Sequence, residues 1–307
     1  MMFVVCFGDG LGNQMFQYAF YKSLQQTYPE NDVFMDIYRI YGKHIHNGFE
    51  LTDIFGIPRN EVQLVYSLRL ADYWPDTKLY YKVMNKIHNL RRHIFGIKPS
   101  HIKQDDPTGF YKSVFELEDS KSYLLCGNWV NEKYFENVKE EVIKDFQFPP
   151  ITDEHNMEYL NQIQESESVS VHIRKGDYIG SAMINLGVDY YKLAKKELEL
   201  RVKNPKYFIF TDDKNAISEY LELFDEYVIV EGNSGNQSFR DMQLMSNCKH
   251  NIIPNSTFSF WGAYLNKNPE KVVIAPSKAK HDFRHPFACA DWTVIPYLGE
   301  EKANNNN

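Results

Sequence analysis

Short apolar runs alternate regularly with longer amphipathic stretches from about residue 165 onward, and this alternation constrains the fold more than any other feature. Runs rich in β-branched and aromatic residues predict buried strands, and apolar residues at helical spacing predict helices. Repeated strand–helix units predict a parallel sheet with helices on both faces. The predicted strands are 169–173, 207–210, 227–230, 251–253 and 272–275, and the predicted helices are 190–202, 217–224, 239–247 and 256–265.

The first part of the chain begins with a similar unit. Pro149, Pro150 and the polar run 152–156 then indicate a linker. We therefore predict an α/β protein of two Rossmann-type domains, 1–150 and 151–300, which face each other across a cleft and are followed by a disordered tail over 301–307. In the first domain we expect strands over 3–7, 33–36 and 123–127, and helices over 14–26, 79–93 and 132–145.

Composition excludes several classes of protein. The net charge of −7 argues against a nucleic-acid-binding surface, which would be basic. No run approaches the roughly 18 apolar residues that a membrane span needs, and the N-terminus has no signal-peptide pattern. The four cysteines form no CxxC pair and predict reduced thiols in a cytoplasmic protein; they are Cys6, Cys126, Cys248 and Cys289.

The segment from His172 to Asp177 is the most charged of the polar clusters at predicted strand ends. Strand alternation places His172 and Arg174 on one side. Arginine is suited to multidentate contacts with phosphate, and Lys175 adds a second positive charge. Asp177 could orient Arg174 or cap the next segment. The cluster indicates an anion site, although a solvated charged turn would give the same pattern.

Two more polar clusters follow predicted strands. Asp212 and Asp213 could bind a nucleoside, or one of them could cap the next helix, and adjacent acids lack the two-residue spacing typical of metal-dependent sugar-nucleotide enzymes. The other cluster opens a predicted helix, where hydroxyls and backbone N–H groups suit a phosphate, although a simple N-cap by Asn255 or Ser256 is the alternative. Its members are Asn255, Ser256, Thr257 and Ser259.

The glycine-rich turn from Gly8 to Asn13 joins the first predicted strand to a helix. It is no Walker A loop, because no Gly-Lys-Ser/Thr follows. It resembles a dinucleotide fingerprint imperfectly, since Asn13 stands where the third glycine belongs, and Asp36 lies near the expected position of a ribose-binding acid. The turn predicts either an anion site or a tight β–α connection without a ligand.

Four ordered motifs resemble those of the α-1,2-fucosyltransferases of bacterial type, over residues 8 to about 295. The stretch 10–19 resembles their N-terminal motif, and 172–178 resembles the first motif shared by α-1,2- and α-1,6-fucosyltransferases. The stretches 210–213 and 241–262 resemble the second and third. Two positions depart from the pattern. Lys175 replaces the usual arginine and loses its fork geometry, and Pro254 replaces a small residue.

The resemblance implies a GT-B-like fold with an acceptor-side N-terminal domain and a C-terminal domain that binds GDP-fucose. It implies transfer of L-fucose to the 2-hydroxyl of a terminal galactose, with inversion, no metal and no further cofactor. By carry-over, the resemblance implies that Arg174 binds the β-phosphate, that His172 contacts the nucleoside or its phosphates, and that Asp212 accepts from guanine or nearby groups. The predicted donor-binding set is Gly10, Gly12, Asn13, Gln14, His172, Arg174, Lys175, Asp212, Asp213, Asn255, Ser256, Thr257 and Ser259.

The predicted catalytic residues are Arg174, His172, Asp177 and Asp9, with His44 and His46 as further alternatives for the general base. Two other functions stay open, a nicotinamide-dependent oxidoreductase and a non-catalytic carbohydrate-binding protein. The expected partners are GDP-fucose and a galactose-terminated glycan, and no nucleic acid. Peripheral contact with membrane-linked glycan precursors at the inner face of the membrane is left open, because the Tyr-rich basic segment 60–100 fits either a membrane surface or helix packing.

Overall fold

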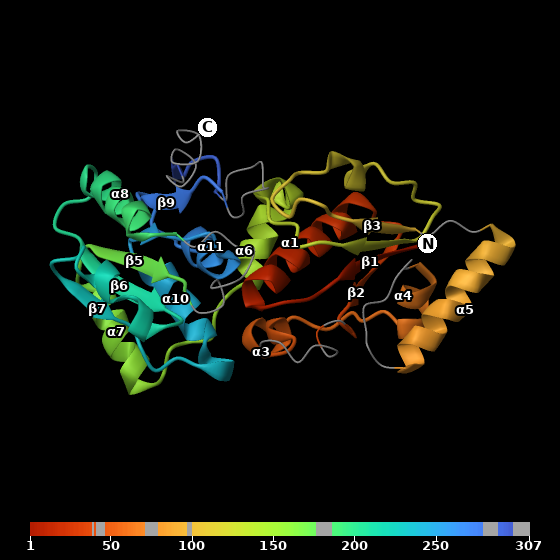
Figure 1. Cartoon of the computed structure of the whole chain (residues 1–307), viewed down its shortest axis with the longest axis horizontal. Coiled ribbons are helices and arrows are strands. Elements are labelled where there is room, and N and C mark those ends of the chain that lie inside the picture. Colours follow the sequence, from red (N-terminus) through yellow and green to blue (C-terminus); the bar gives the residue numbers. More distant parts are fainter. Residues whose placement is uncertain are drawn as a thin grey trace, which may run out of the picture. The chain divides into compact units, whose positions relative to one another are not determined.

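The computed structural model describes residues 1–38, 40, 47–70, 79–96, 100–175, 186–278 and 288–296. The chain divides into two compact units, Met1–Gln147 and Phe148–Asn307 (Figure 1). Each unit contains its own parallel sheet, so the predicted α/β class with two Rossmann-type units is confirmed. His44, His46, Asp177 and the predicted tail over 301–307 lie outside the described residues.

The sheet of the first unit has the strand order β2-β1-β4-β3. The strands are β1 (Met2–Cys6), β2 (Asp32–Asp36), β3 (His101–Lys103) and β4 (Tyr123–Cys126). The helices are α1 (Leu11–Thr27), α3 (Glu50–Phe55), α4 (Leu64–Leu70), α5 (Leu79–Phe95) and α6 (Lys139–Asp145), with 3₁₀ turns η1 (Lys112–Phe115), η2 (Glu132–Tyr134) and η3 (Glu136–Val138).

Helix α1 is buried on nearly every side and lies in the core of this unit. The side chains of Phe16 and Phe20 are fully buried, and the Phe20 ring stacks on Trp129 with centroids 4.2 Å apart. The continuous helix predicted over 132–145 is wrong, because two 3₁₀ turns precede α6. Asn131 favours that break, since its side chain accepts a hydrogen bond from Lys133 N and caps η2.

The sheet of the second unit has the order β10-β9-β8-β5-β6-β7, and every pairing is parallel. The strands are β5 (Ser168–Ile173), β6 (Lys206–Thr211), β7 (Tyr227–Ile229), β8 (His250–Ile252), β9 (Val273–Pro276) and β10 (Thr293–Ile295). The helices are α7 (Glu154–Gln164), α8 (Val188–Glu199), α9 (Ser218–Leu221), α10 (Phe239–Asn247) and α11 (Thr257–Tyr264), with 3₁₀ turns η4 (Lys214–Ala216) and η5 (Gly235–Gln237).

Helices cover both faces of this sheet, as predicted (Figure 1). Alternate residues of β6 enter different cores. Tyr207 and Ile209 pack in a cluster with residues of α8 and α9, whereas Phe208 and Phe210 pack in one with residues of α7 and α10. The linker predicted over the polar run 152–156 is partly wrong, because α7 begins inside that run. The Asp153 side chain caps the helix by accepting a hydrogen bond from Asn156 N.

Strand β5 occupies the point where the order of the second sheet reverses. The chain continues from β5 to β6 and β7 on one side, and then returns to β8, β9 and β10 on the other. In open parallel sheets, ligands bind outside the carboxyl ends of the strands at such a reversal. The residues that follow β5 and β8 are therefore the expected positions for ligand binding in this unit.

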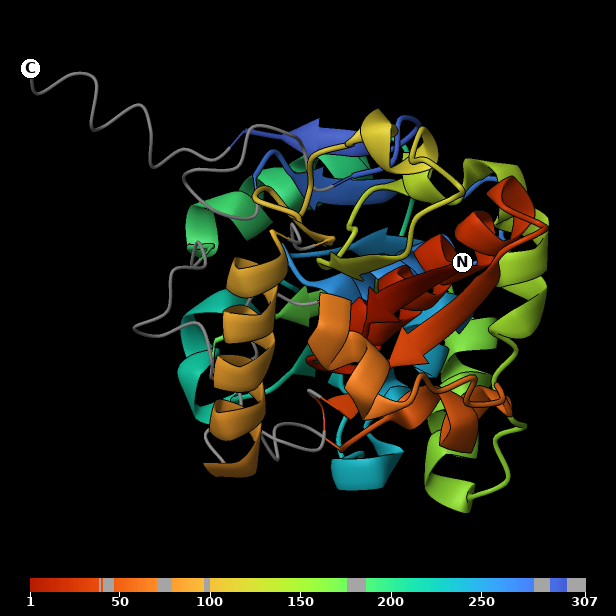
Figure 2. The same cartoon turned by 90° about the vertical axis from the view of Figure 1, so that its right-hand side faces the viewer.

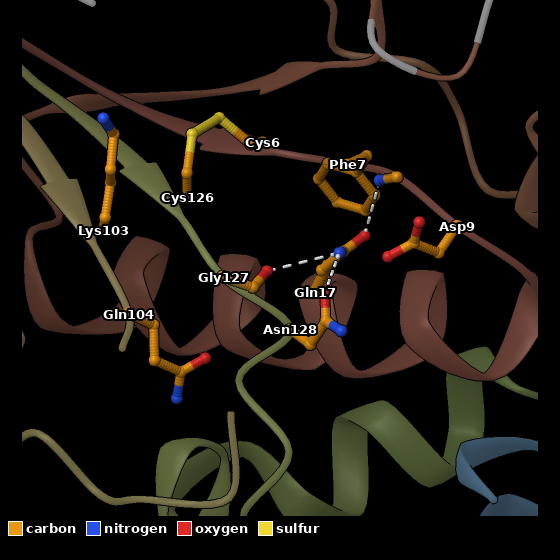
Figure 3. A pocket seen from close by; sticks show the side chains of 10 residues that line it. Cys6, Phe7, Asp9, Gln17, Lys103, Gln104, Cys126, Gly127 and Asn128 are labelled. Atoms are coloured by element: carbon orange, nitrogen blue, oxygen red, sulfur yellow. Dashed lines mark hydrogen bonds between the residues drawn. A yellow bond between two sulfur atoms is a disulfide. The ribbon is translucent and has the colours of Figure 1, made fainter. Parts of the chain in front are cut away.

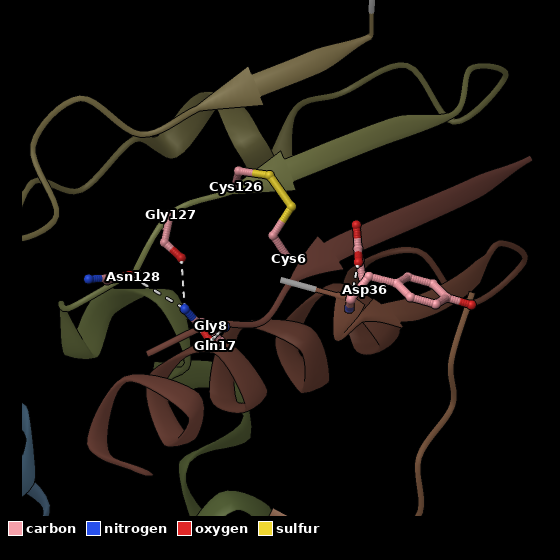
Figure 4. The surroundings of a disulfide bond; sticks show 8 residues. Cys6, Gly8, Gln17, Asp36, Cys126, Gly127 and Asn128 are labelled. Atoms are coloured by element: carbon pink, nitrogen blue, oxygen red, sulfur yellow. Dashed lines mark hydrogen bonds between the residues drawn. A yellow bond between two sulfur atoms is a disulfide. The ribbon is translucent and has the colours of Figure 1, made fainter. Parts of the chain in front are cut away.

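Cys6 and Cys126 form a disulfide between the ends of β1 and β4 (Figure 4). The prediction of four reduced thiols is therefore wrong for this pair, while Cys248 and Cys289 are both buried. Parallel pairing of Val5 with Leu125 brings the cysteines together across 120 residues of sequence, a relationship that cysteine spacing does not reveal. The cytoplasmic location loses its support from the cysteines. Among the described residues, no helix has the length and apolarity to cross a bilayer.

Candidate functional site

Arg174 and Asp212 follow neighbouring strands of the second unit and lie together. Ile173 at the end of β5 is in register with Thr211 at the end of β6. The Arg174 Nε is 3.6 Å from Asp212 Oδ2, and Lys175 N donates to Asp212 Oδ1 at 2.9 Å. One carboxylate therefore fixes the backbone after β5 and orients the guanidinium, and both side chains are still partly exposed to a ligand.

His172 is buried beside the start of α11. Its ring centroid lies 6.1 Å from that of Phe258, in the first turn of α11, and its carbonyl accepts from Tyr191 Oη at 2.9 Å. The residue thus links the end of β5 to the segment after β8. The structure brings together two of the clusters that the sequence predicted separately.

Lys175 contacts a different element from Arg174. Its Nζ lies 4.5 Å from the centroid of the Tyr220 ring, in α9. Burial lowers the pKa of the Lys175 ammonium, and the nearby Glu219 acts in the opposite direction. Lys175, which replaces the arginine usual in the family motif, therefore makes a cation–π contact with Tyr220. The contact of Lys175 with the donor stays a prediction.

Helix α11 starts at the carboxyl end of β8. Ser256 occupies the N-cap position with extended backbone (φ −118°), but within the described residues its side chain makes no capping hydrogen bond. Backbone N–H groups in a first helical turn point out of the helix and suit an anion. Asn255 and Ser256 are buried, Thr257 is half-buried, and the Ser259 hydroxyl donates to Ser256 O. Direct phosphate contacts by these side chains stay predictions.

Asp213 has a separate structural role. Its carboxylate accepts from Asn215 N at 3.0 Å and caps η4, so the capping alternative holds for Asp213, whereas Asp212 bonds to the segment after β5. The part of the chain that the structure describes contains no cluster of three or more His, Cys, Asp or Glu side chains placed to hold a metal.

Asp241 is a site candidate to which the sequence assigned no role. It lies in the first turn of α10, the helix that follows β7, and burial raises its pKa to about 7. Asn233 Nδ2 donates to Asp241 Oδ1 at 2.8 Å and opposes that shift. The sequence motif contained Asp241, but only the fold reveals its burial.

The first unit contains a polar pocket of about 300 Å³ at the carboxyl ends of β1, β3 and β4 (Figure 3). Asp9 lines it with a left-handed backbone (φ 61°), a conformation that is uncommon for residues other than glycine but that aspartate and asparagine adopt more readily than most. The structure places Asp9 on the wall of this pocket, and its catalytic role stays a prediction. Other polar side chains on the pocket wall are Gln17, Lys103, Gln104 and Asn128.

Two buried amides hold the turn that carries Asp9. Gln14 Nε2 donates to the carbonyls of Asp9 and Gly48, at 2.9 and 2.8 Å. Gln17 Oε1 accepts from Gly8 N, and its Nε2 donates to Gly127 O (Figure 3). The Gln14 amide is thus engaged with the backbone, which gives this motif residue a structural role that the sequence did not reveal.

The remaining predicted residues of the turn belong to the start of α1. Gly10 is the N-cap of the helix, its carbonyl accepts from Asn13 N at 3.0 Å, and Gly12 is buried. Their predicted donor contacts stay predictions. Asp36 is fully buried and its carboxylate accepts from Tyr38 N, so it is not exposed to a ribose as the oxidoreductase alternative requires.

Comparison with known proteins gives a family and several relatives. The sequence model of the family described as "Glycosyl transferase family 11" matches residues 2–295. An Escherichia coli alpha-1,2-colitosyltransferase is 32% identical, over 87% of this chain and 89% of the relative. The E. coli O-antigen biosynthesis glycosyltransferase WbnK is 27% identical, over 89% and 93%.

More distant similarities were also found. A Caenorhabditis elegans galactoside 2-alpha-L-fucosyltransferase is 26% identical, over 53% of this chain and 48% of the relative. Among solved structures, the NodZ alpha-1,6-fucosyltransferase soaked with GDP-fucose is 18% identical and has a TM-score of 0.48, over 86% of this chain and 92% of that one.

Proposed function

Because the chain belongs to glycosyl transferase family 11, we propose that it transfers L-fucose from GDP-fucose to the 2-hydroxyl of a terminal galactose. Membership makes the chain a glycosyltransferase, and the oxidoreductase and non-catalytic alternatives are set aside. The finer assignment draws support from the four motifs and from the names of the α-1,2-specific relatives. We further propose that the second unit binds the donor and the first unit binds the acceptor.

One observation carries the donor site: Arg174 and the N-terminus of α11 follow β5 and β8, which are neighbouring strands at the reversal of the sheet. Negative charge builds on the β-phosphate as the bond between fucose C1 and the phosphate oxygen breaks. The Arg174 guanidinium, oriented by Asp212, and the N–H groups of the first turn of α11 stabilise that charge. These groups supply the positive charge in a mechanism without a metal.

For the acceptor we propose the polar pocket of the first unit, with Asp9 as the general base. The Asp9 carboxylate takes the proton of the galactose 2-hydroxyl, the oxygen bonds to fucose C1, and GDP leaves with the electron pair of the broken bond. Attack from the face opposite GDP inverts the anomeric centre and gives an α-linkage from the β-linked donor. Two features support this role, the left-handed backbone of Asp9 and its place on the pocket wall.

Transfer of colitose is a second candidate, favoured by the relative that is 32% identical to the chain. Colitose is L-fucose without its 3-hydroxyl. A site that hydrogen-bonds a substrate hydroxyl rejects the analogue without it by several orders of magnitude, because its own polar groups are left unpaired. The two donors are therefore separable by rate.

The discriminating experiment compares GDP release from GDP-fucose and GDP-colitose with lactose as acceptor. We expect kcat/KM for GDP-fucose to exceed that for GDP-colitose by more than about 100-fold. An equal or larger value for GDP-colitose would move the assignment to colitosyl transfer. A parallel assay with EDTA tests the metal-free mechanism, which predicts an unchanged rate, and loss of activity that Mg²⁺ or Mn²⁺ restores would contradict it.

We also propose a cytoplasmic enzyme that meets membrane-linked glycan precursors peripherally. Support comes from the basic segment 60–100 and from the relative named for O-antigen biosynthesis. Fractionation of cells that produce the chain at native level tests this, since the enzyme should appear in the cytoplasm and partly with inner membranes. Recovery from the periplasm would contradict it.

A further inference from the structure

Helix α5 exposes a continuous apolar stripe. The stripe consists of side chains three or four residues apart, a spacing that aligns them along one side of a helix. Leu79, Leu90 and Ile94 are 77%, 60% and 64% exposed, and Val83 and Ile87 are about half exposed. Single exposed apolar residues are ordinary, but five in one stripe form a surface that water solvates poorly.

The opposite side of α5 holds the helix to its unit. Met84 packs against the core cluster that contains Val4 and Leu124. His88 and Arg92 are buried, and Arg92 donates to the Arg69 carbonyl at 2.9 Å. The attachment therefore uses the side away from the stripe. Both views show α5 beside α4 at the outside of the first unit (Figures 1 and 2).

Cations border the stripe, and the sequence of α5 contains no acid. Lys82, Lys86, Arg91 and His93 are exposed. The whole chain has a net charge of −7, whereas this helix is positively charged. A helix with an exposed apolar stripe flanked by lysine and arginine matches the chemistry of an anionic membrane surface, where the apolar side chains enter the acyl region and the cations meet the headgroups.

We propose that α5 docks the protein on a leaflet that contains anionic lipids. A second copy of the chain fits the same helix less well, because pairing the stripe with itself would place two sets of cations side by side without an acid on either helix. The docking surface contains none of the residues assigned to the donor site or the acceptor pocket. Its function would be to hold the enzyme at the surface where lipid-linked acceptors are found, and vesicle binding measures it independently of turnover.

Co-sedimentation with vesicles tests the proposal. One set of vesicles is phosphatidylcholine alone, and the other is an equimolar mixture of phosphatidylcholine and phosphatidylglycerol. We expect the protein to sediment only with the mixture and to be released by high salt. Leu90→Glu should weaken binding at least about tenfold, since it places a charge in the apolar stripe. Leu200→Glu is the matched control, because Leu200 is 71% exposed in the second unit, and it should bind normally.

Further measurements decide between the remaining outcomes. Leu90→Glu should keep the thermal midpoint of the wild type and its rate with soluble lactose. Leu90→Trp should show a blue shift of tryptophan fluorescence only with anionic vesicles. The proposal is overturned if the wild type does not bind anionic vesicles, or if Leu200→Glu weakens binding equally. It is also overturned if Leu90→Glu turns a dimer into a monomer in light scattering while vesicle binding is unchanged.

Discussion

Asp212 holds Arg174 in place: its Oδ2 lies 3.6 Å from the Arg174 Nε, while its Oδ1 accepts the backbone N–H of Lys175. The three residues follow two strands that are paired in register, so the geometry of the site is set by the sheet. An arginine fixed from behind in this way presents its terminal nitrogens in one orientation, which lowers the entropy lost when it grips a phosphate.

Substitution of Asp212 with Asn should therefore reduce catalysis. The amide can still accept the Lys175 N–H, but the charge that orients Arg174 is lost, and kcat/KM should fall about 10- to 100-fold. Arg174→Ala should lower kcat/KM about 1,000-fold, because it removes the charge itself. Initial rates with GDP-fucose and GDP binding by calorimetry measure both effects. The control is Asp213→Asn, since Asp213 caps η4, and full activity in Asp212→Asn would refute the role of the pair.

Asp9→Asn should separate catalysis from donor binding. Asparagine tolerates a left-handed backbone and keeps the size of the side chain, but it cannot act as a base at neutral pH. We expect kcat to fall about 100-fold or more, with GDP affinity unchanged. Asp9→Gly keeps the left-handed backbone accessible but removes the carboxylate, so it should also lose activity. A Michaelis constant that rises while kcat stays normal would give Asp9 a binding role instead.

Asp241→Asn should change how stability depends on pH. The Asp241 pKa is raised from 3.8 to about 7, so the folded protein keeps a proton that the unfolded chain releases. Its contribution to unfolding free energy therefore declines as pH rises from about 4 to 7 and stays low above 7. Asparagine lacks this decline and can still accept from Asn233. The thermal midpoint of the variant minus that of the wild type should therefore be larger at pH 8 than at pH 5. An equal difference at the two pH values would contradict the raised pKa of Asp241.

Glu167→Gln should lower stability without touching catalysis. Glu167 precedes β5, and its carboxylate accepts from His250 Nε2 and Lys249 Nζ, both at the start of β8, at 2.9 and 3.0 Å. These contacts lie at the amino ends of the strands. Hydrogen bonds from His250 and then Lys249 lower the Glu167 pKa.

The Glu167 carboxylate contributes its full stabilisation at pH values above 4.5, its pKa in the unfolded chain. That contribution is lost as the pH falls through the lower pKa of the folded state. Because Glu167 is partly exposed, we expect a loss of only about 0.5–1 kcal/mol at pH 7, shrinking in acid. Chemical denaturation at pH 7 and pH 3 measures the difference. A matching fall in kcat at pH 7 would contradict the separation of this contact from the catalytic site.

The strands and helices of the second unit were predictable because apolar runs and helical spacing are local. Strand β10 and helix α7 were not, since a three-residue strand leaves little pattern and the run before Asn156 resembled a linker. Strand order is also non-local. The sequence put polar clusters at three strand ends, but only the sheet shows that β5 lies between β6 and β8.

The candidate site shows the same division. Arg174 and Asp212 were predicted as separate phosphate and nucleoside ligands, and their pairing depends on the register of β5 and β6. The disulfide of Cys6 depends on the register of β1 and β4. Motif resemblance named Gln14 as a donor ligand, which stays a prediction, but it could not show that the Gln14 amide also holds the backbone of the turn.

The linkage of the product tests the central claim most directly. The purified chain is incubated with GDP-fucose and lactose, and the product is analysed by two-dimensional NMR. We predict one fucose joined through an α-linkage to the 2-hydroxyl of galactose, and no such product from Arg174→Ala under the same conditions. Fucose on another hydroxyl, a β-linkage, or equal product from the variant would contradict the account.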